Sequence, residues 1–211
     1  PYEAEIIVVD DGSTDATCDI VADFAKTADV PLVLEKLPEN QGKGCAVRTG
    51  MLQRAAGQYR FFYDADASTP IEEVERCFPL FASGADIIIG SRALPDSVIQ
   101  IRQAWYREYM GRCYNLLEKL LRVTSFKDTQ CGFKGFSADA AHCCFSRQTI
   151  DRFSFDAEIL FIAKKHGLKI QELPVHWLNS PKSRVDPVTD AARMFFDLLV
   201  IHFNNFTGKY R

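Results

Sequence analysis

Short apolar runs alternate with amphipathic stretches through the first half of the chain. The apolar runs have the length of buried strands, which we predict at 6–9, 31–34, 59–63 and 86–89. The amphipathic stretches between them predict helices at 16–26, 45–56 and 71–81. This alternation of strands and helices predicts an α/β sandwich with a mostly parallel sheet.

Longer periodic stretches fill the second half of the chain. They predict helices at 159–166, 189–204 and 97–122, the last being one long helix or two shorter ones. We also predict a strand at 168–177 and loops at 126–135 and 179–185. Because the sequence shows no internal repeat or linker, we expect residues 1–211 to form a single domain.

Polar residues follow three of the predicted strands at the point where each strand ends. Asp10 and Asp11 end the first strand, Asp64 and Asp66 follow the third, and Arg92 follows the fourth. Ligands of parallel α/β sheets bind beyond the carboxyl ends of the strands. The three motifs therefore predict one site at this edge of the sheet.

These carboxylates allow more than one interpretation. Two carboxylates spaced like Asp64 and Asp66 point to the same side of an extended chain and can share Mg²⁺ or Mn²⁺; a solvated acidic turn is the alternative. A buried carboxylate at Asp10 or Asp11 can accept a hydrogen bond from a base N–H or a ribose hydroxyl. For that pair the alternative is a helix N-cap.

The segment 40–44 contains two glycines and a lysine, which suits phosphate binding. It fails the P-loop pattern, because Leu37 stands where that motif needs glycine and Gly44 where it needs Ser or Thr. It also fails the dinucleotide fingerprint, because Val47 occupies the position of the last small residue. What remains is a flexible loop that enters a helix and whose backbone can approach a ligand.

Composition and charge narrow the class of protein. The 211 residues are 47% hydrophobic and 25% charged, which excludes a disordered chain. The formal net charge of −3 argues against a nucleic-acid binder that is basic overall. The seven cysteines form no C-x-x-C pair and favour reduced thiols in the cytosol over a disulfide framework or a zinc site.

Several motifs together resemble one enzyme family. The segments 10–15, 40–44 and 64–66, in this order and spacing, resemble an inverting family 2 glycosyltransferase. The segment 128–134 (Asp-Thr-Gln-Cys-Gly-Phe-Lys) is similar to the polyprenyl-phosphate glycosyltransferases, especially to the dolichyl-phosphate β-glucosyltransferase branch. Further similarities to that branch lie at 155–158, 175–177 and 182–185.

The resemblance implies a fold and a reaction. The fold would be a three-layer, GT-A-like sandwich whose first strand and helix precede Pro1, so that the catalytic domain 1–211 is N-terminally incomplete relative to the family. The reaction would transfer glucose, with inversion, from UDP-glucose to a dolichyl or other polyprenyl phosphate, assisted by Mg²⁺ or Mn²⁺. Two alternatives stay open: a related transferase with another donor or a soluble acceptor, and a non-catalytic nucleotide-sugar-binding module.

The resemblance also implies roles for individual residues. Asp64 and Asp66 would hold the metal, with Asp66 as the more direct and catalytic ligand, and Asp11 would contact the uracil or the ribose. Arginine forks and lysine ammonium groups suit phosphate oxygens. The remaining candidates for substrate binding are Asp10, Lys43, Arg92, Gln130, Lys134, Lys182 and Arg184.

The acceptor decides whether a catalytic base is needed. A phosphomonoester has a second pKa of about 6 and is largely ionised at pH 7, so a lipid phosphate is already a nucleophile. Positioning and charge screening would then matter more than proton abstraction. For a hydroxyl acceptor, Asp128 or Asp156 would be the base to test.

An isoprenoid phosphate resides in a membrane, so we expect a peripheral protein at the cytoplasmic face of a membrane. The segment 97–122 interleaves apolar residues with basic ones, and 194–203 is a second apolar and aromatic stretch. Such faces suit the membrane interface. The alternative is that both pack on the sheet or in a homo-oligomer. We expect no nucleic-acid partner.

Overall fold

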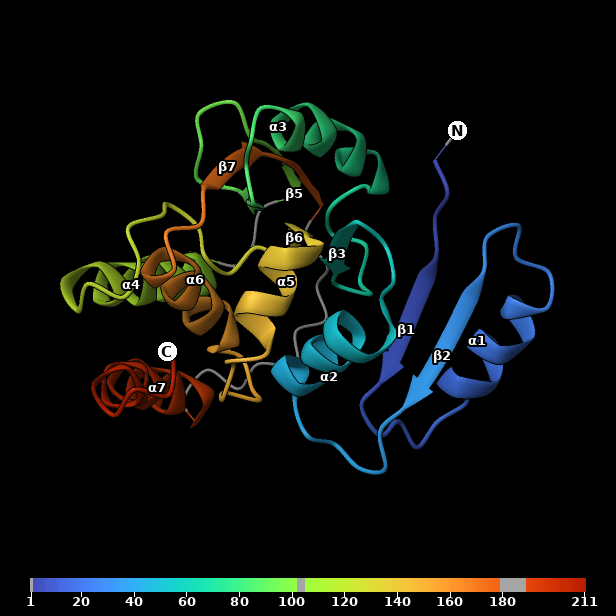
Figure 1. Cartoon of the computed structure of the whole chain (residues 1–211), viewed down its shortest axis with the longest axis horizontal. Coiled ribbons are helices and arrows are strands. Elements are labelled where there is room, and N and C mark those ends of the chain that lie inside the picture. The colour runs from blue at the N-terminus through green and yellow to red at the C-terminus, as the bar shows by residue number, and fades with distance from the viewer. Residues whose placement is uncertain (1, 102–104, 179–188) are drawn as a thin grey trace.

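The computed structural model describes residues 2–101, 105–178 and 189–211, and a four-stranded sheet lies at its centre (Figure 1). The order of its strands is β3 (Tyr59–Tyr63), β6 (Phe133–Ser137), β4 (Ile87–Ser91) and β7 (Ile170–Pro174). Strand β6 runs antiparallel to both of its neighbours, and β4 and β7 are parallel. Three of the four strands therefore run the same way, which confirms the mostly parallel α/β sheet.

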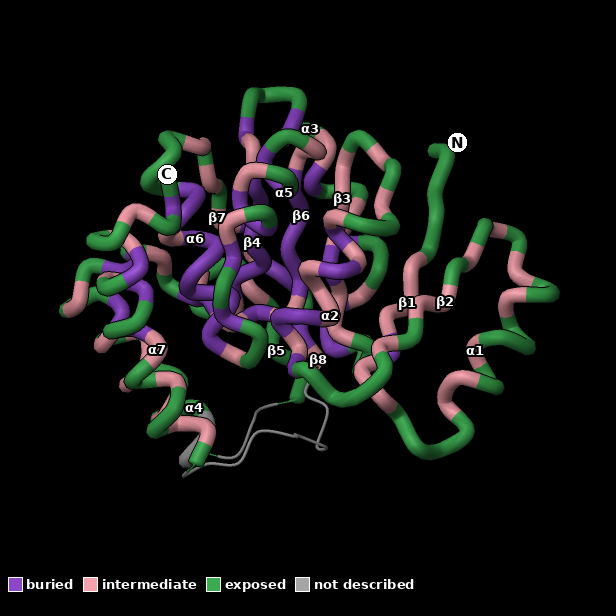
Figure 2. Tube along the Cα trace, turned by 60° about the horizontal axis from the view of Figure 1, so that its bottom comes forward, coloured by how far each residue is buried: buried purple, intermediate pink, exposed green. Residues whose placement is uncertain are grey.

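Two parallel pairs of strands flank this sheet. Strand β1 (Ile6–Asp10) pairs with β2 (Leu32–Lys36), and β5 (Val98–Ile101) pairs with β8 (His176–Leu178). The β1–β2 pair lies with helix α1 (Thr17–Ala25) at one end of the molecule (Figure 1). Helix α1 has no buried residue, whereas the inner strands β4 and β6 of the central sheet and helix α6 (Phe155–Lys165) are mostly buried (Figure 2).

Helices cover both faces of the central sheet. On β4, Ile87 and Ile89 pack with residues of α5 (Ala138–Phe145), α6 and α7 (Thr189–Phe206). Ile88 points the other way and packs with residues of α3 (Phe78–Ala82) and with Trp177. This alternation is the period of two that a strand imposes, and it produces three layers.

Several predicted elements have a different form. The segment 97–122 contains strand β5 before helix α4 (Trp105–Leu120), because the apolar residues Val98 and Ile99 pair with β8. The helix predicted at 45–56 is α2 (Lys43–Thr49) followed by a π-helical turn at Gly50–Arg54. The helix at 71–81 begins as a 3₁₀ helix, η2 (Ile71–Cys77), which leads into α3.

The loop predicted at 126–135 is shorter in the structure, because a strand begins before its end and a helix follows that strand. The end of that segment belongs to strand β6, whose central Gly135 packs directly under the ring of Phe61. Helix α5 comes next, and the hydroxyl of its N-cap residue Ser137 accepts a hydrogen bond from the N–H of Ala140. The predicted loop at 179–185 lies outside the described residues.

None of the helices in the described part of the chain combines the length and the apolar character that crossing a membrane requires.

Candidate active site

One edge of the central sheet collects most of the predicted site residues. The carboxyl ends of β3, β4 and β7 lie at this edge, and antiparallel β6 begins there. The turn after Tyr63, the residues after Ser91 and the segment before Phe133 therefore meet. Of the three motifs that the sequence predicts to meet at the carboxyl edge of one sheet, those after β3 and β4 do so. Asp10 and Asp11 differ from this prediction, because β1 belongs to a separate pair with β2.

Asp11 organises the loop that precedes α2. Its two carboxylate oxygens accept hydrogen bonds from the backbone N–H groups of Gln41 (2.7 Å) and Gly42 (2.9 Å). Gly42 has a φ of 108°, and a β-carbon there would meet the carbonyl of Asp151, so only glycine fits. This geometry places Lys43 at the first position of α2.

Lys43 connects the residues after β1 with those after β3, because Asp11 holds the loop before it and its own side chain pairs with Asp64. Its Nζ lies 2.7 Å from Oδ1 of Asp64, and both side chains are partly exposed. Although burial lowers the pKa of Lys43, Asp156 and Asp64 raise it above its ordinary value, so this ammonium group stays charged. Asp10 is buried instead, and a hydrogen bond from Ser13 lowers the pKa of its carboxyl group.

The Asp64–Asp66 turn presents its two carboxylates differently. The N–H of Asp64 donates to the carbonyl of Gly132 (2.9 Å), and a β-carbon on Gly132 would overlap the carboxylate of Asp64. Asp66 is exposed, and its Oδ1 accepts a hydrogen bond from the N–H of Ser68 (3.0 Å). Gly132 is thus a site residue that motif reading did not single out.

The donor set of this turn fits a hard divalent cation. In the described residues no cluster of three or more His, Cys, Asp or Glu side chains forms a complete protein cage. Mg²⁺ is commonly held by one or two carboxylates together with substrate phosphates and water, which is the arrangement that two carboxylates on an open turn allow. Asp66, exposed, and Asp64, shared with Lys43, are the residues that would hold it.

Arg92 is held rigidly on the opposite side of the site. Its Nε and Nη2 donate to the two oxygens of Asp128 at 2.6 and 2.8 Å, and its backbone N–H donates to the same carboxylate at 2.9 Å. The guanidinium carbon also lies 5.4 Å from the ring centroid of Trp177. Burial raises the pKa of Asp128, but Arg92 more than offsets this, so the net pKa is lowered.

A second ion pair is buried outside the lining of the candidate site. The Nζ of the fully buried Lys134 donates to Oδ1 of Asp156 (2.5 Å) and to the carbonyl of Cys131 (2.8 Å), and it lies 5.0 Å from the ring centroid of Phe62. Burial raises the pKa of Asp156. Both groups of this pair are therefore occupied by protein partners.

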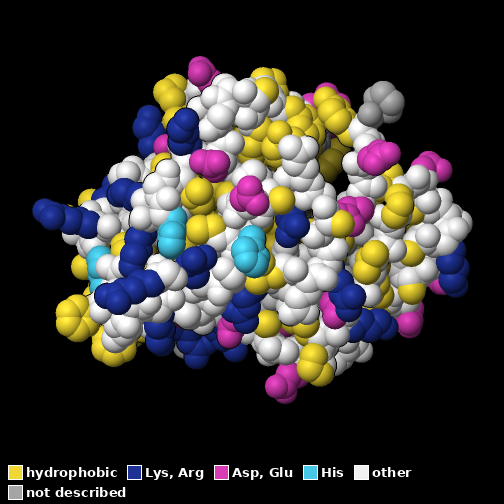
Figure 3. Space-filling view, in the orientation of Figure 1, with side chains coloured by type: hydrophobic (Ala, Val, Ile, Leu, Met, Phe, Trp, Pro, Cys, Tyr) yellow, Lys and Arg dark blue, Asp and Glu magenta, His cyan; other side chains and the backbone are white. Residues whose placement is uncertain are grey.

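A continuous cleft of about 2280 Å³ connects these groups with the apolar walls of β1 and β3. Of the predicted residues, those that line it are Lys43, Asp64, Asp66, Arg92 and Gln130. Hydrophobic side chains surround the hollow beside the N-terminal segment (Figure 3). The Nε2 of Gln130 is buried and has no hydrogen-bond partner in the described residues, so it is available to a ligand oxygen.

The other predicted residues support the cleft or lie elsewhere. Asp10, Asp11, Asp128, Lys134 and Asp156 are not part of its lining. Asp10 and Asp11 accept backbone N–H groups, and Asp128 holds Arg92, which does line the cleft. Lys134 and Asp156 pair with each other. Lys182 and Arg184 lie outside the described residues. Trp177, whose ring lies beneath the guanidinium of Arg92, belongs to the segment 175–177 that resembles the family branch, but its sequence pattern assigns it no role in the site.

Comparison with known proteins places this architecture in a family. The family profile described as glycosyl transferase family 2 matches residues 1–145. A dolichyl-phosphate beta-glucosyltransferase from Dictyostelium discoideum is 33% identical over 100% of this chain and 66% of its own length. The human protein of that name is 32% identical over 100% of this chain and 67% of its own length.

A solved structure shares the fold. Glucosyl-3-phosphoglycerate synthase from Mycobacterium tuberculosis superposes with a TM-score of 0.63 over 95% of this chain and 68% of its own, at 17% sequence identity. The chain spans 66% and 67% of the lengths of these two dolichyl-phosphate beta-glucosyltransferases, and 59% of the length of a further protein of that activity from Trichomonas vaginalis. The profile match and the full-chain identity to these relatives establish that the chain belongs to glycosyl transferase family 2.

Proposed function

We propose that this chain transfers glucose from UDP-glucose to a dolichyl or related polyprenyl phosphate, with inversion at the anomeric carbon. The observation that carries the proposal is the placement of Asp64, Asp66, Lys43 and Arg92 around one cleft. The names of the relatives specify dolichyl phosphate and glucose. The structural neighbour has been crystallised with Mn²⁺ and UDP-glucose, which supports the choice of donor.

The two sides of the cleft suit the two ends of a nucleotide-sugar diphosphate. A Mg²⁺ or Mn²⁺ ion bound at Asp64 and Asp66 would supply Lewis-acid neutralisation of the diphosphate charge. Lys43 and Arg92 provide fixed positive charge for phosphate oxygens, and the guanidinium of Arg92 adds a planar fork. The Nε2 of Gln130, which has no hydrogen-bond partner among the described residues, provides a further donor at the cleft lining.

The state of the acidic residues favours a phosphate acceptor. The carboxylate of Asp128 is used by three donors of Arg92, and Asp156 is used by Lys134, so neither is a free base at the cleft. An acceptor phosphate is largely ionised at pH 7 and needs no base. The chain's residues would then bind, orient and screen two anionic substrates, and Lys182 and Arg184 remain candidates for the acceptor phosphate.

The direct test measures UDP release from UDP-glucose, with Mn²⁺, in the presence and absence of a short polyprenyl phosphate. We expect release that depends on the lipid phosphate and a β-linked glucosyl product identified by NMR. Release with a soluble hydroxyl acceptor alone would favour a related transferase. Saturable UDP-glucose binding without turnover on any acceptor would favour a binding module.

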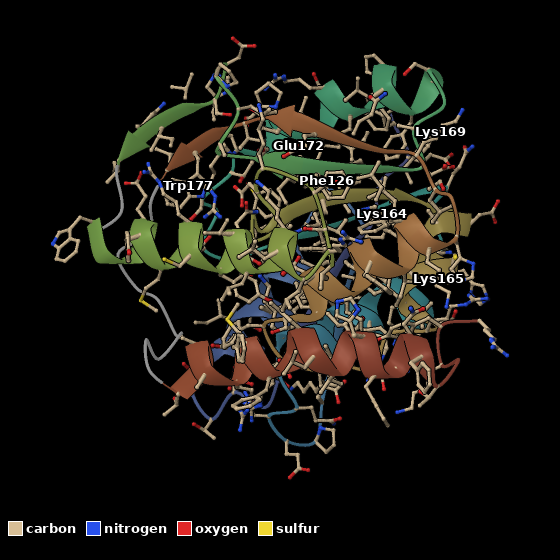
Figure 4. The ribbon with its side chains drawn as sticks, turned by 90° about the vertical axis from the view of Figure 1, so that its left-hand side faces the viewer. Phe126, Lys164, Lys165, Lys169, Glu172 and Trp177 are labelled. Atoms are coloured by element: carbon tan, nitrogen blue, oxygen red, sulfur yellow. The ribbon has the colours of Figure 1, made fainter. Side chains whose placement is uncertain are left out.

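A specific surface favours action at a membrane. Helices α4 and α7 run alongside each other across one face of the molecule (Figure 4), and Nε2 of His202 lies 2.6 Å from the carbonyl of Leu121. Both helices expose apolar side chains, namely Trp105, Tyr109, Leu116, Leu120, Phe196, Leu199, Phe203 and Phe206. Aromatic rings beside basic residues suit the interfacial zone of a bilayer.

Liposome sedimentation tests this surface. We expect binding to vesicles containing phosphatidylserine at low salt and its loss at high salt. Reversal of two exposed charges, Arg112→Glu with Lys119→Glu, should weaken binding, because each basic residue near an anionic surface contributes about 1 kcal/mol. Salt-independent self-association of the protein, without vesicle binding, would assign the surface to an oligomer instead.

A further inference from the structure

The buried face of α4 contains a carboxylate where its helical pattern calls for an apolar residue. Tyr114 and Leu117 of this face pack against the main core, as does Leu121 just after the helix, and Glu118 lies among them in sequence. The side chain of Glu118 is fully buried, and no salt bridge among the described residues includes it. A buried carboxylate without a cation is costly, so its place in the fold requires an explanation.

Hydrogen bonds connect Glu118 with the segment that follows α4. The hydroxyl of Thr129 donates to its carboxylate at 2.8 and 2.9 Å from the two oxygens, and the hydroxyl of Thr124 lies 3.4 Å from Oε2. Both threonines are buried. Asn115, one turn earlier on α4, donates to the carbonyl of Phe126 at 3.1 Å. Helix α4 thus holds this segment at two points.

The same segment holds the cationic side of the cleft. Thr129 lies between Asp128, which binds Arg92, and Gln130, which lines the cleft. From the sheet side, Glu172 of β7 accepts the N–H groups of Lys127 and Asp128 (Figure 4). The segment 127–130 is therefore fixed between two carboxylates, one on the sheet and one on α4.

We propose that Glu118 is a positioning residue that acts through Thr129 to fix the 128–130 segment, so that Arg92 and Gln130 keep their orientation toward the phosphate-bearing substrate. This inference deepens the function proposed above and rests on it for the identity of that substrate. Glu118 itself does not line the cleft, so its effect passes through the segment.

The charge state of Glu118 gives this role a pH dependence. Burial raises the pKa of Glu118 to about 7, with a further rise from Asp156 of α6, while the threonine hydroxyls and Lys134 of β6 lower it. The phenol of Tyr114 on α4 also faces it, with Asp197 of α7 near that phenol. The ionised carboxylate accepts the stronger hydrogen bond from Thr129, so cleft order should increase as pH rises through about 7.

Stability should change in the opposite direction. Because the folded-state pKa lies above the unfolded value of 4.5, the folded protein binds the extra proton between pH 4.5 and about 7, and the stability from Glu118 is lost as pH rises through that window. Glu118→Gln removes this loss while retaining the shape. A purely structural role would make activity and stability change together, whereas a positioning role separates them.

The test compares two threonines that contact the same carboxylate. Thr129→Val should lower kcat/KM about tenfold and weaken UDP binding in the presence of Mn²⁺ by a similar factor, because it frees the 128–130 segment. Thr124→Val, the matched control, should change both by less than about twofold, and Thr129→Ser should restore both. Glu118→Gln should remove the rise of kcat/KM near pH 7 without lowering the melting temperature at pH 8.

The outcomes are distinguishable from failure of the proposed function. If polyprenyl phosphate is not glucosylated at all, UDP affinity still reports on the segment, and a difference between the two valine variants supports the inference. Equal effects of Thr129→Val and Thr124→Val on UDP affinity overturn it. An unchanged pH profile of UDP affinity in Glu118→Gln also overturns it, and this second measurement decides the matter should Thr129→Val fail to fold.

Discussion

On one side of the cleft the carboxylate of Asp66 is exposed and accepts one backbone hydrogen bond. On the other side Arg92 is bound by Asp128, and its guanidinium lies over the ring of Trp177. The first arrangement leaves an anion free to adapt to a cation that arrives with a substrate. The second presents a cation whose orientation is fixed before any substrate binds, which lowers the cost of binding. The cleft thus combines an adaptable acidic side with a preorganised basic side.

The largest effect is expected on the adaptable side. Asp66→Asn removes one anion from the candidate metal site and should lower kcat at saturating Mn²⁺ by about 10²- to 10³-fold, since Lewis-acid stabilisation contributes several kcal/mol. The melting temperature should stay unchanged because the side chain is exposed. Asp96→Asn, an exposed residue outside the cleft, is the control. A normal rate in Asp66→Asn would remove the metal role from this residue.

Gly132→Ala alters the same side indirectly. The added β-carbon would overlap the carboxylate of Asp64, which must then move away from Lys43. We expect a loss of roughly 30- to 100-fold in kcat/KM with the fold retained, because misplaced catalytic groups cost about this much. Gly111→Ala is the matched control, since a β-carbon there meets no atom within 4 Å. Similar kinetics in both variants would show that Asp64 needs no fixed position.

Local patterns predicted the acidic side better than the basic side. Strand β3 occupies 59–63 as predicted, because an aromatic run followed by Asp64 and Asp66 marks both the strand and its end. The partners of these residues come from distant parts of the chain. Asp128 follows Arg92 by 36 residues, and its contact with Arg92 depends on β4 lying beside β6. Periodicity in one segment contains no information about such a neighbour.

Strand β6, which the sequence pattern does not predict, shows why local patterns miss such contacts. Strand β6 contains Lys134 and Gly135, which break the apolar pattern that predicts a buried strand. Both are explained only by tertiary contacts, since Lys134 pairs with Asp156 of α6 and Gly135 admits the ring of Phe61. The motif containing Gln130 and Lys134 could therefore be identified as part of a site, while its strand and its ion pairs could not.

The Arg92–Asp128 ion pair on the preorganised side should contribute to the free energy of unfolding. The folded-state pKa of Asp128 lies below the ordinary value of 3.8, so its contribution is fully present above pH 3.8 and is lost as pH falls through the folded-state pKa. Asp128→Asn should therefore lower the free energy of unfolding by roughly 2 kcal/mol at pH 7. The difference from wild type should shrink below about pH 4. Guanidinium denaturation at pH 7 and pH 3 measures it.

A matched control variant separates the effect of Asp128 from that of removing any surface carboxylate. Asp23→Asn removes a carboxylate whose pair with Lys26 is largely exposed, so it should change the free energy of unfolding by less than about 0.5 kcal/mol at either pH. An Asp128→Asn penalty that is equal at pH 7 and pH 3 would mean that the ionised carboxylate is not what holds Arg92.

The smallest effect is expected on KM in variants of Arg92. Two replacements distinguish the contribution of its positive charge from that of its fixed orientation. Arg92→Ala should raise KM for UDP-glucose about tenfold, because a charge-assisted contact is lost. Arg92→Lys retains the charge but loses the two-pronged contact with Asp128 and the guanidinium contact with the ring of Trp177, so preorganisation predicts most of the same loss. Arg54→Ala, at an exposed arginine that pairs with Glu35 outside the cleft lining, should leave KM unchanged. If Arg92→Lys instead behaves like wild type in steady-state kinetics, positive charge alone is sufficient. The basic side is then as adaptable as the turn that contains Asp66, and the contrast between the two sides does not hold.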